Sequence, residues 1–192
     1  MAEIQHRMAV AWQKFWAMKR SLLNVRVSRR KRLQLFDASV GSSFLYGAHA
    51  WTPRAEELRK IRTVQNSMLR RICSFARGGD EPWLDWLRRT TRAARKCAET
   101  GGVRDWVAAH AERKWCWAGR VARRPATSWL WQVASWRDAE GIETTVDSTV
   151  RRPSRRRWMK WEDALRRFVS GRGGRSWMTL AQNNEQWNDL AG

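Results

Sequence analysis

Apolar side chains recur at helical spacing along most of this chain. In residues 3–23 they stand three or four positions apart, and a second such run covers residues 33–46, with glycines at 41 and 47 as weak points. No segment alternates apolar and polar positions in the way a half-buried strand does. We therefore expect an all-α fold: a helical bundle, then a basic linker, then short C-terminal helices.

The clearest predicted helix follows Thr52-Pro53. Thr52 suits the N-cap position and Pro53 the first helical position. Its apolar stripe consists of Leu58, Ile61, Val64, Met68, Leu69 and Ile72, and the arginines away from that stripe are Arg59, Arg62, Arg70 and Arg71. One face therefore seeks a core. The other is either a solvated surface or a contact to phosphate, and the residue types leave both open.

Composition divides the chain into four regions. Residues 1–76 form the first group of helices, and residues 83–136 form a Trp-rich helical region after the loop at 76–82. Residues 137–159 are a linker, acidic at first and strongly basic at its end, and residues 160–192 are C-terminal helices. Most of the 15 tryptophans are expected in or beside the core, because Trp is on average highly buried.

The charge of the chain points to a polyanionic partner. There are 38 Lys and Arg against 18 Asp and Glu, a formal net charge of +20. Two clusters stand out, Arg29, Arg30, Lys31 and Arg32, and then Arg151, Arg152, Arg155, Arg156 and Arg157. Internal clusters of this kind favour nucleic acid over a membrane surface, although the second cluster could equally be a tail that binds any polyanion. The few, widely spaced cysteines suit an intracellular protein.

The residue patterns of common enzyme chemistries are missing from the sequence. Metal-dependent polymerases and nucleases need clustered carboxylates, whereas adjacent acids occur here only as isolated pairs, such as Asp80-Glu81 and Glu162-Asp163. The cysteines and histidines do not have zinc-ligand spacing, and we expect the thiols to be buried. No glycine-rich phosphate loop is present. We expect no catalytic residue, metal site or cofactor, and hence no enzymatic activity of the chain alone.

One long segment resembles a known family. LFDASVGSSFLYGAHAWTPRAEELRKIRTVQNSMLRRICSFAR (residues 35–77) is similar to the segment that follows the catalytic palm in reverse transcriptases of non-LTR (LINE-type) retrotransposons. The similarity rests on Leu45-Tyr46-Gly47, on Trp51, and on the run from Gln65 to Ile72, which resembles Q-x-x-M-L-R-x-I.

Weaker motifs continue the resemblance in the same order, from about Leu33 to Trp187. Residues 115–123 (WCWAGRVAR) resemble the family's W-x-G-H-V-x-R, with Arg120 in place of the histidine. Arg152-Pro153 and residues 160–163 (KWED) resemble G-R-P-x-x-R-W-x-D. Trp177, residues 181–184 (AQNN) and Trp187 resemble a closing W…A-x-D-R-x-x-W that has lost both charges.

The resemblance implies a thumb, a helical element that packs on the polymerase core and holds the template-primer duplex. It implies that the basic residues named above bind RNA, DNA or a hybrid, and that Phe44, Tyr46, Gly47 and Trp51 form a packed hinge against a core, which a separate palm domain could supply. It also implies a nuclear location. A different interpretation is a structural or interaction remnant that needs a palm to fold and has no activity of its own.

Overall fold

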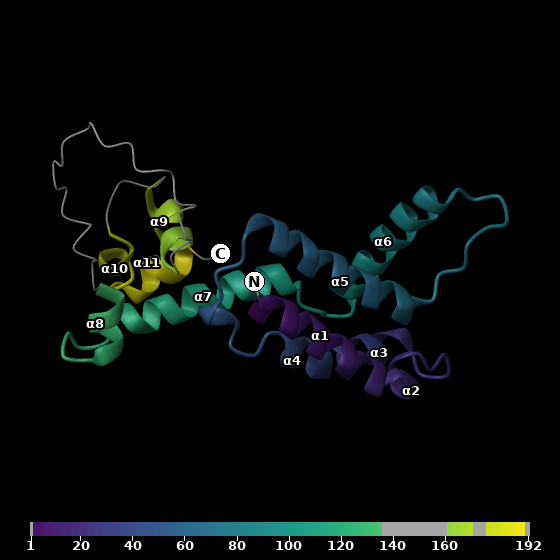
Figure 1. The fold of residues 1–192 in the computed structure, drawn as a ribbon, viewed down its shortest axis with the longest axis horizontal. Helices are drawn as coiled ribbons and strands as arrows, with labels where there is room; N and C mark the ends of the chain where they lie inside the picture. Colours follow the sequence, from purple (N-terminus) through teal and green to yellow (C-terminus); the bar gives the residue numbers. More distant parts are fainter. Residues whose placement is uncertain (1, 136–160, 171–175, 191–192) are drawn as a thin grey trace. The chain divides into compact units, whose positions relative to one another are not determined.

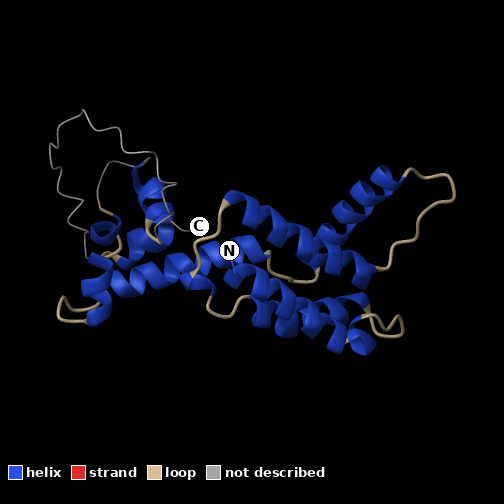
Figure 2. Cartoon of the chain, in the orientation of Figure 1, coloured by secondary structure: helices blue, strands red, loops and turns tan. Residues whose placement is uncertain are grey.

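The computed structural model describes residues 2–135, 161–170 and 176–190. Within these ranges the chain is helical and contains no strand, as predicted (Figure 2). The helices are α1 (Ala2–Ala17), α2 (Lys19–Leu22), α3 (Arg29–Phe36), α4 (Ser42–Phe44), α5 (Ala55–Cys73), α6 (Trp83–Thr100), α7 (Trp106–Ala122), α8 (Trp129–Ser135), α9 (Asp163–Ser170), α10 (Trp177–Leu180) and α11 (Asn184–Asp189) (Figure 1).

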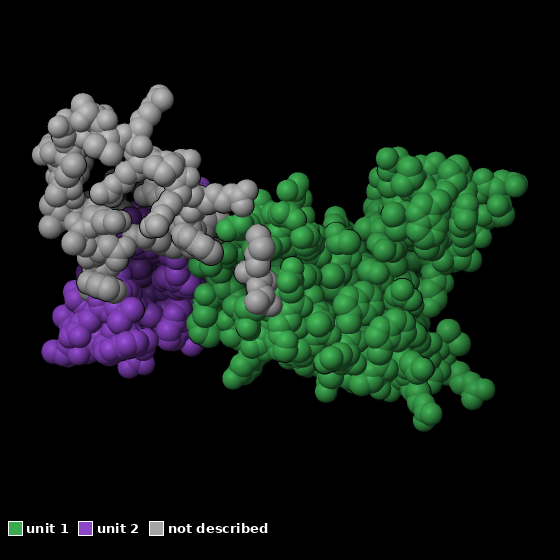
Figure 3. Space-filling model, in the orientation of Figure 1, with its two compact units in different colours: residues 1–113 green, residues 114–192 purple. Residues whose placement is uncertain are grey.

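The chain forms two compact units, residues 1–113 and residues 114–192 (Figure 3). The division falls within α7, and therefore inside the predicted region 83–136 rather than at one of the predicted boundaries. In the first unit, α5 packs against α6, and α1, α3 and α4 cluster beside them. Its core holds Phe15, Phe36, Phe44, Ile61 and Trp106, each fully buried.

The predicted stripe of α5 faces this core. Ile61, Met68, Leu69 and Ile72 are buried, and the remaining stripe residues are half-buried. The helix begins at Ala55 rather than at Pro53, because the carboxylate of Glu57 accepts a hydrogen bond from the backbone N–H of Arg54 at 2.8 Å. Arg54, not Thr52, is therefore the N-cap residue.

The segment from Arg29 to Phe44 runs through helical turns of two kinds. A π-helical turn, Asp37–Gly41, separates α3 from α4, and Gly41, one of the expected weak points, closes it. A Cβ at Gly41 would lie 3.3 Å from the carboxylate of Asp37, so the tight approach favours glycine. Gly47 adopts φ 69°, a left-handed conformation that glycine takes at little cost.

The predicted hinge aromatics separate into buried and exposed residues. Phe44 is fully buried and stacks on Trp106, with ring centroids 4.2 Å apart. Trp51 is buried against Phe44 and stacks on His110. Tyr46 is 70% exposed, with the guanidinium of Arg7 over its ring, so the first unit does not bury it and its packing role stays a prediction. The first unit thus buries Phe44 and Trp51 within its own core.

Candidate nucleic-acid interface

The four arginines predicted on α5 do not share one surface. On a helix with 3.6 residues per turn, Arg59, Arg62 and Arg70 lie on one side, and Arg71 lies about a third of a turn away. The Arg71 guanidinium sits over the rings of Trp12 and Trp16 of α1, 5.8 and 5.3 Å from their centroids. Arg71 therefore borders the aromatic cluster of α1, whereas Arg70 contacts α6 and Arg62 shares a hollow with it.

Two polar contacts join the basic side of α5 to α6. Arg70 donates a hydrogen bond to the hydroxyl of Thr91 at 2.9 Å, and Arg95 donates one to the side-chain oxygen of Asn66 at 3.0 Å. Partial burial, with the charge of Arg71 second, lowers the pKa of Arg70. Arg59 and Arg62 are exposed. Arg70 therefore helps position the two helices, and Arg59 and Arg62 present the charge.

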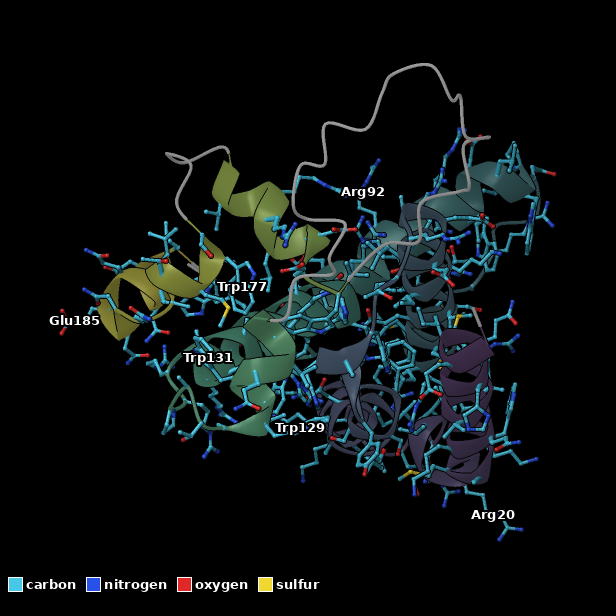
Figure 4. All side chains as sticks on the ribbon, turned by 60° about the vertical axis from the view of Figure 1, so that its left-hand side comes forward. Arg20, Arg92, Trp129, Trp131, Trp177 and Glu185 are labelled. Atoms are coloured by element: carbon cyan, nitrogen blue, oxygen red, sulfur yellow. The ribbon has the colours of Figure 1, made fainter. Side chains whose placement is uncertain are left out.

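The second half of the basic surface lies on α6. Four of its basic side chains, Arg88, Arg92, Arg95 and Lys96, are exposed, and Arg92 is labelled in Figure 4. They stand opposite the buried residues Thr90, Ala94 and Ala98. Sequence analysis did not select them, although the spacing of positions 88, 92 and 95 is the signal of a single helix face and could have done so.

Shallow hollows run along this basic surface. One, of about 270 Å³, lies between α5 and α6 and is lined in part by Arg62, Asn66 and Arg95, together with the acids Glu99 and Asp105. A second, of about 700 Å³, follows α6 past Arg88, Arg92, Arg95, Lys96 and again Glu99, over Leu87 and Thr91. Both hollows place guanidinium groups where an extended anionic chain could lie.

The basic cluster Arg29–Arg32 also divides, into exposed side chains and one buried side chain. Arg29, Arg30 and Lys31 are exposed, and Arg29 and Arg30 line a hollow of about 350 Å³ together with Lys96 of α6. This hollow extends the basic surface from α6 to the start of α3. Ser28 caps that start by accepting a hydrogen bond from the N–H of Lys31.

Arg32 has a different role from the one predicted. It is 6% exposed, and its guanidinium donates to the backbone carbonyl oxygens of Ile72 at 2.6 Å and Val27 at 3.1 Å. Ile72 lies in the last turn of α5, where carbonyl groups lack partners within the helix. Arg32 thus ties α3 to the end of α5 and does not reach an external phosphate. We correct its assignment from binding to structural.

Arg89 also belongs to the scaffold rather than to the basic surface. Its guanidinium donates to both carboxylate oxygens of Glu81 at 2.7 Å and to the carbonyl of Ala76 at 3.1 Å. The hydrogen bond from Arg89 is the main cause that lowers the pKa of Glu81. This pair holds the loop that leads into α6. The adjacent acids Asp80-Glu81 therefore supply a loop anchor.

Motif residues of the second unit meet in its core. The rings of Trp115 and Trp187 stack with centroids 3.7 Å apart, and each indole N–H donates to the other residue's carbonyl, at 2.9 and 3.1 Å. Arg123 donates to the carbonyl of Ala181 at 3.0 Å, and Trp177 donates to Glu162 at 3.3 Å. Residues of motifs that lie far apart in the sequence are thus packing partners, and they build a core rather than a binding site.

Two groups of expectations remain. Arg151, Arg152, Arg155, Arg156 and Arg157 lie outside the described residues. Of the thiols, Cys73 is buried, but Cys116 is exposed, so the expectation of buried thiols fails there.

Among the residues that the structure describes, no three His, Cys, Asp or Glu side chains gather closely enough to hold a metal ion. None of the described helices is long and apolar enough to cross a membrane.

Comparison with known proteins shows a relationship to a protein of transposon origin. The chain is 27% identical, over 97% of its length, to a transposon-derived protein of Caenorhabditis elegans, and it spans 63% of that relative's length. Neither a protein-family model nor a solved structure matches the chain. The chain is therefore similar to a protein of transposable-element origin.

Proposed function

We propose that this chain is a non-catalytic, nucleic-acid-binding thumb and tail region of a LINE-type reverse transcriptase. The resemblance in residues 35–77 and the transposon-derived relative support the origin. One structural observation supports the binding: exposed arginines of α5 and exposed arginines and a lysine of α6 gather on two helices that pack against each other. The surface holds RNA, DNA or a hybrid by the phosphate backbone.

The chemistry of the surface suits sequence-independent binding. Guanidinium groups form charge-assisted, often bidentate hydrogen bonds to phosphate oxygens. Each neutralised phosphate releases condensed counterions, so affinity falls steeply with salt concentration. Because the helices are fixed by the core and by the Arg70–Thr91 and Arg95–Asn66 contacts, the charges are held in place before the ligand arrives.

The aromatic packing bears on the alternative, a remnant that needs a palm to fold. Phe44 and Trp51 are buried against Trp106 and His110 of the same chain. The first unit therefore has a core without a second polypeptide. A separate palm remains a proposed partner, for activity rather than for folding.

The test is a salt titration of binding to a labelled RNA–DNA primer-template, measured by fluorescence anisotropy on the full chain. One variant changes Arg62, Arg92, Arg95 and Lys96 to Gln. A matched control changes Lys14, Lys19, Arg20 and Arg26, which are also exposed, to Gln. Figure 4 shows Arg20 and Arg92 far apart on the first unit.

We expect the α5/α6 variant to lower the slope of log K against log [salt] by ~3 to 4, about one per lost phosphate contact. The control should change it by less than ~1. If both variants lowered the slope equally, the binding would be only non-specific attraction to a basic protein. A slope unchanged in both would move binding to Arg151–Arg157, which a third variant with those arginines changed to Gln examines.

A further inference from the structure

Two cysteines far apart in the sequence meet where α5 and α6 pack together. Cys73 is the last residue of α5 and is 2% exposed, and Cys97 lies in the last turn of α6 and is half-buried. The two thiols interact through a hydrogen bond. Proximity of this kind is the first requirement for a disulfide between two cysteines.

A cation is held beside the more accessible sulfur. Arg29 donates a hydrogen bond from Nη1 to Sγ of Cys97 at 3.7 Å, and its guanidinium lies over the ring of Phe75, 5.4 Å from the centroid. Arg29 is therefore held between α6 and the chain that follows α5. A guanidinium in this position stabilises the negative charge on a sulfur that takes part in thiol–disulfide exchange.

Cys97 also lines a positively charged hollow. This hollow of about 350 Å³, which we call the Cys97 hollow, is lined by Arg29, Arg30, Leu33, Lys96, Cys97, Thr100 and Gly101. None of these described lining residues is acidic, and three of them are basic. Its volume lies at the lower end of the range for small-molecule sites. The Cys97 hollow therefore suits a small anionic molecule that comes to lie against a thiol.

Burial gives the two thiols different roles. It raises the pKa of Cys73 to about 11, with the neighbouring Cys97 as the second cause, and the charges of Arg29 and Arg32 oppose this shift. Cys73 is also closed off from solvent, so a reagent in the Cys97 hollow meets Cys97 first. Cys73 stands behind it, where its sulfur can react with the sulfur of Cys97.

We propose that Cys97 and Cys73 are an oxidisable thiol pair, and that the Cys97 hollow binds an anionic disulfide such as glutathione disulfide. In the first step the Cys97 sulfur attacks one sulfur of the bound disulfide. A mixed disulfide forms, and the glutathione thiolate that leaves takes up the proton lost by Cys97.

In the second step the Cys73 sulfur attacks the Cys97 sulfur of the mixed disulfide. The bond between Cys97 and glutathione breaks, the disulfide between Cys73 and Cys97 forms, and the second glutathione leaves with the proton lost by Cys73. Overall, two protein thiols are oxidised and one disulfide is reduced to two glutathione molecules. The product fastens the end of α5 to α6. This chemistry does not depend on the proposed binding of nucleic acid.

The experiment incubates the reduced full chain with glutathione disulfide or with cystamine, a cationic disulfide that reacts by the same exchange. Free thiols are then alkylated, and peptide mass spectrometry quantifies the mixed disulfides and the Cys73–Cys97 disulfide. The exposed Cys116 serves as the reference thiol in every sample.

Three variants of the full chain isolate the parts of the proposal. Cys73→Ser removes the second thiol. Arg30→Gln combined with Lys96→Gln removes charge from the Cys97 hollow without touching the sulfurs. The matched control combines Arg88→Gln with Arg92→Gln, which are exposed on the same helix but do not line this hollow.

Relative to Cys116, we expect Cys97 to react ~10-fold faster with glutathione disulfide than with cystamine, because positive potential concentrates anions. The wild-type chain should go on to the Cys73–Cys97 disulfide, and Cys73→Ser should accumulate the mixed disulfide at Cys97. The variant of Arg30 and Lys96 should lose most of the preference, and the control of Arg88 and Arg92 should keep it.

Different results would overturn the two parts separately. A preference no greater at Cys97 than at Cys116, or one that survives the loss of Arg30 and Lys96, would refute the Cys97 hollow as an anion site. A mixed disulfide at Cys97 that persists in the wild-type chain, with Cys73 still reduced, would refute the thiol pair. If Cys97 stayed reduced while Cys116 was modified, both parts would fail.

Discussion

Gly119 is the position where the smallest change should have a large effect on the second unit. A Cβ added there would lie 2.8 Å from two atoms of the Trp187 indole and 3.1 Å from the Arg123 guanidinium. Ordinary carbon contacts begin near ~3.5 Å, so the indole would have to move by about 0.7 Å. Trp187 is 1% exposed and stacked on Trp115, which leaves it little space. The change Gly119→Ala therefore overpacks the core.

Two destabilising terms and one stabilising term set the size of the effect. Overpacking costs typically ~1 to 3 kcal/mol, and displacing the indole weakens its hydrogen bond to Trp115, worth about 1 kcal/mol. Replacing a helical glycine by alanine returns about 1 kcal/mol of helix propensity. The net prediction is a loss of about 2 kcal/mol in the free energy of unfolding.

Urea unfolding of the full chain, followed by circular dichroism, measures this loss. Because the indoles of Trp115 and Trp187 stack closely, we expect an exciton contribution in the far ultraviolet that changes on Gly119→Ala. Ala111, exposed in the same helix, supplies the control. Ala111→Gly should cost about 1 kcal/mol by helix propensity alone, so alanine is preferred there. If alanine also stabilised position 119, the packing argument would be refuted.

Three other residues give independent predictions. Burial lowers the pKa of Lys114 from 10.5 to about 8, against the opposing effect of Asp163, so between pH 8 and 10.5 the unfolded chain binds more protons than the folded chain. The free energy of unfolding should therefore rise with pH in that range, by at most ~3 kcal/mol. Urea titrations at stepped pH should show this rise, and Lys114→Met should remove it. Arg32→Met removes the charged donor to the carbonyl oxygens of Ile72 and Val27 and should lower the free energy of unfolding by about 3 kcal/mol. The control Lys31→Met, at an exposed position, should lower it by less than ~0.5 kcal/mol in the same urea titration. Equal effects of the two changes would contradict the structural role of Arg32. Burial raises the pKa of Cys73 to about 11, so a thiol reagent at neutral pH should modify Cys116 readily and Cys73 only after unfolding; similar rates would show that the first unit opens at Cys73.

The helical periodicity predicted much of the fold because it follows from local physics. The stripe of α5 is buried as its spacing required. Its start was misplaced by two residues, because the carboxylate of Glu57 bonds to the N–H of Arg54, and this bond competes with the preference for proline at a first helical position. The long predicted helix at 3–23 ends its first part at Ala17 and resumes at Lys19. Breaks of this kind depend on packing between helices rather than on local sequence.

The candidate site was harder to predict because charge alone does not reveal what a side chain contacts. Arg29 and Arg32 belong to the same basic run, yet Arg29 is exposed and Arg32 is buried against carbonyl groups. Only the tertiary position of the end of α5 distinguishes them. The pairing of Trp115 with Trp187 joins residues 72 apart, and the order of motifs along the chain gave no sign of it. The exposed arginines of α6 could have been predicted, because positions 88, 92 and 95 have the spacing of a single helix face.

The most direct test of the account is a map of which arginines nucleic acid protects from chemical modification. The chain would be treated with an arginine-specific dicarbonyl reagent, with and without the RNA–DNA primer-template, and the modified residues quantified by mass spectrometry. We predict strong protection of Arg62, Arg92 and Arg95 and none of Arg20 and Arg26. Protection confined to Arg151–Arg157, or spread evenly over all exposed arginines, would contradict a binding surface on α5 and α6.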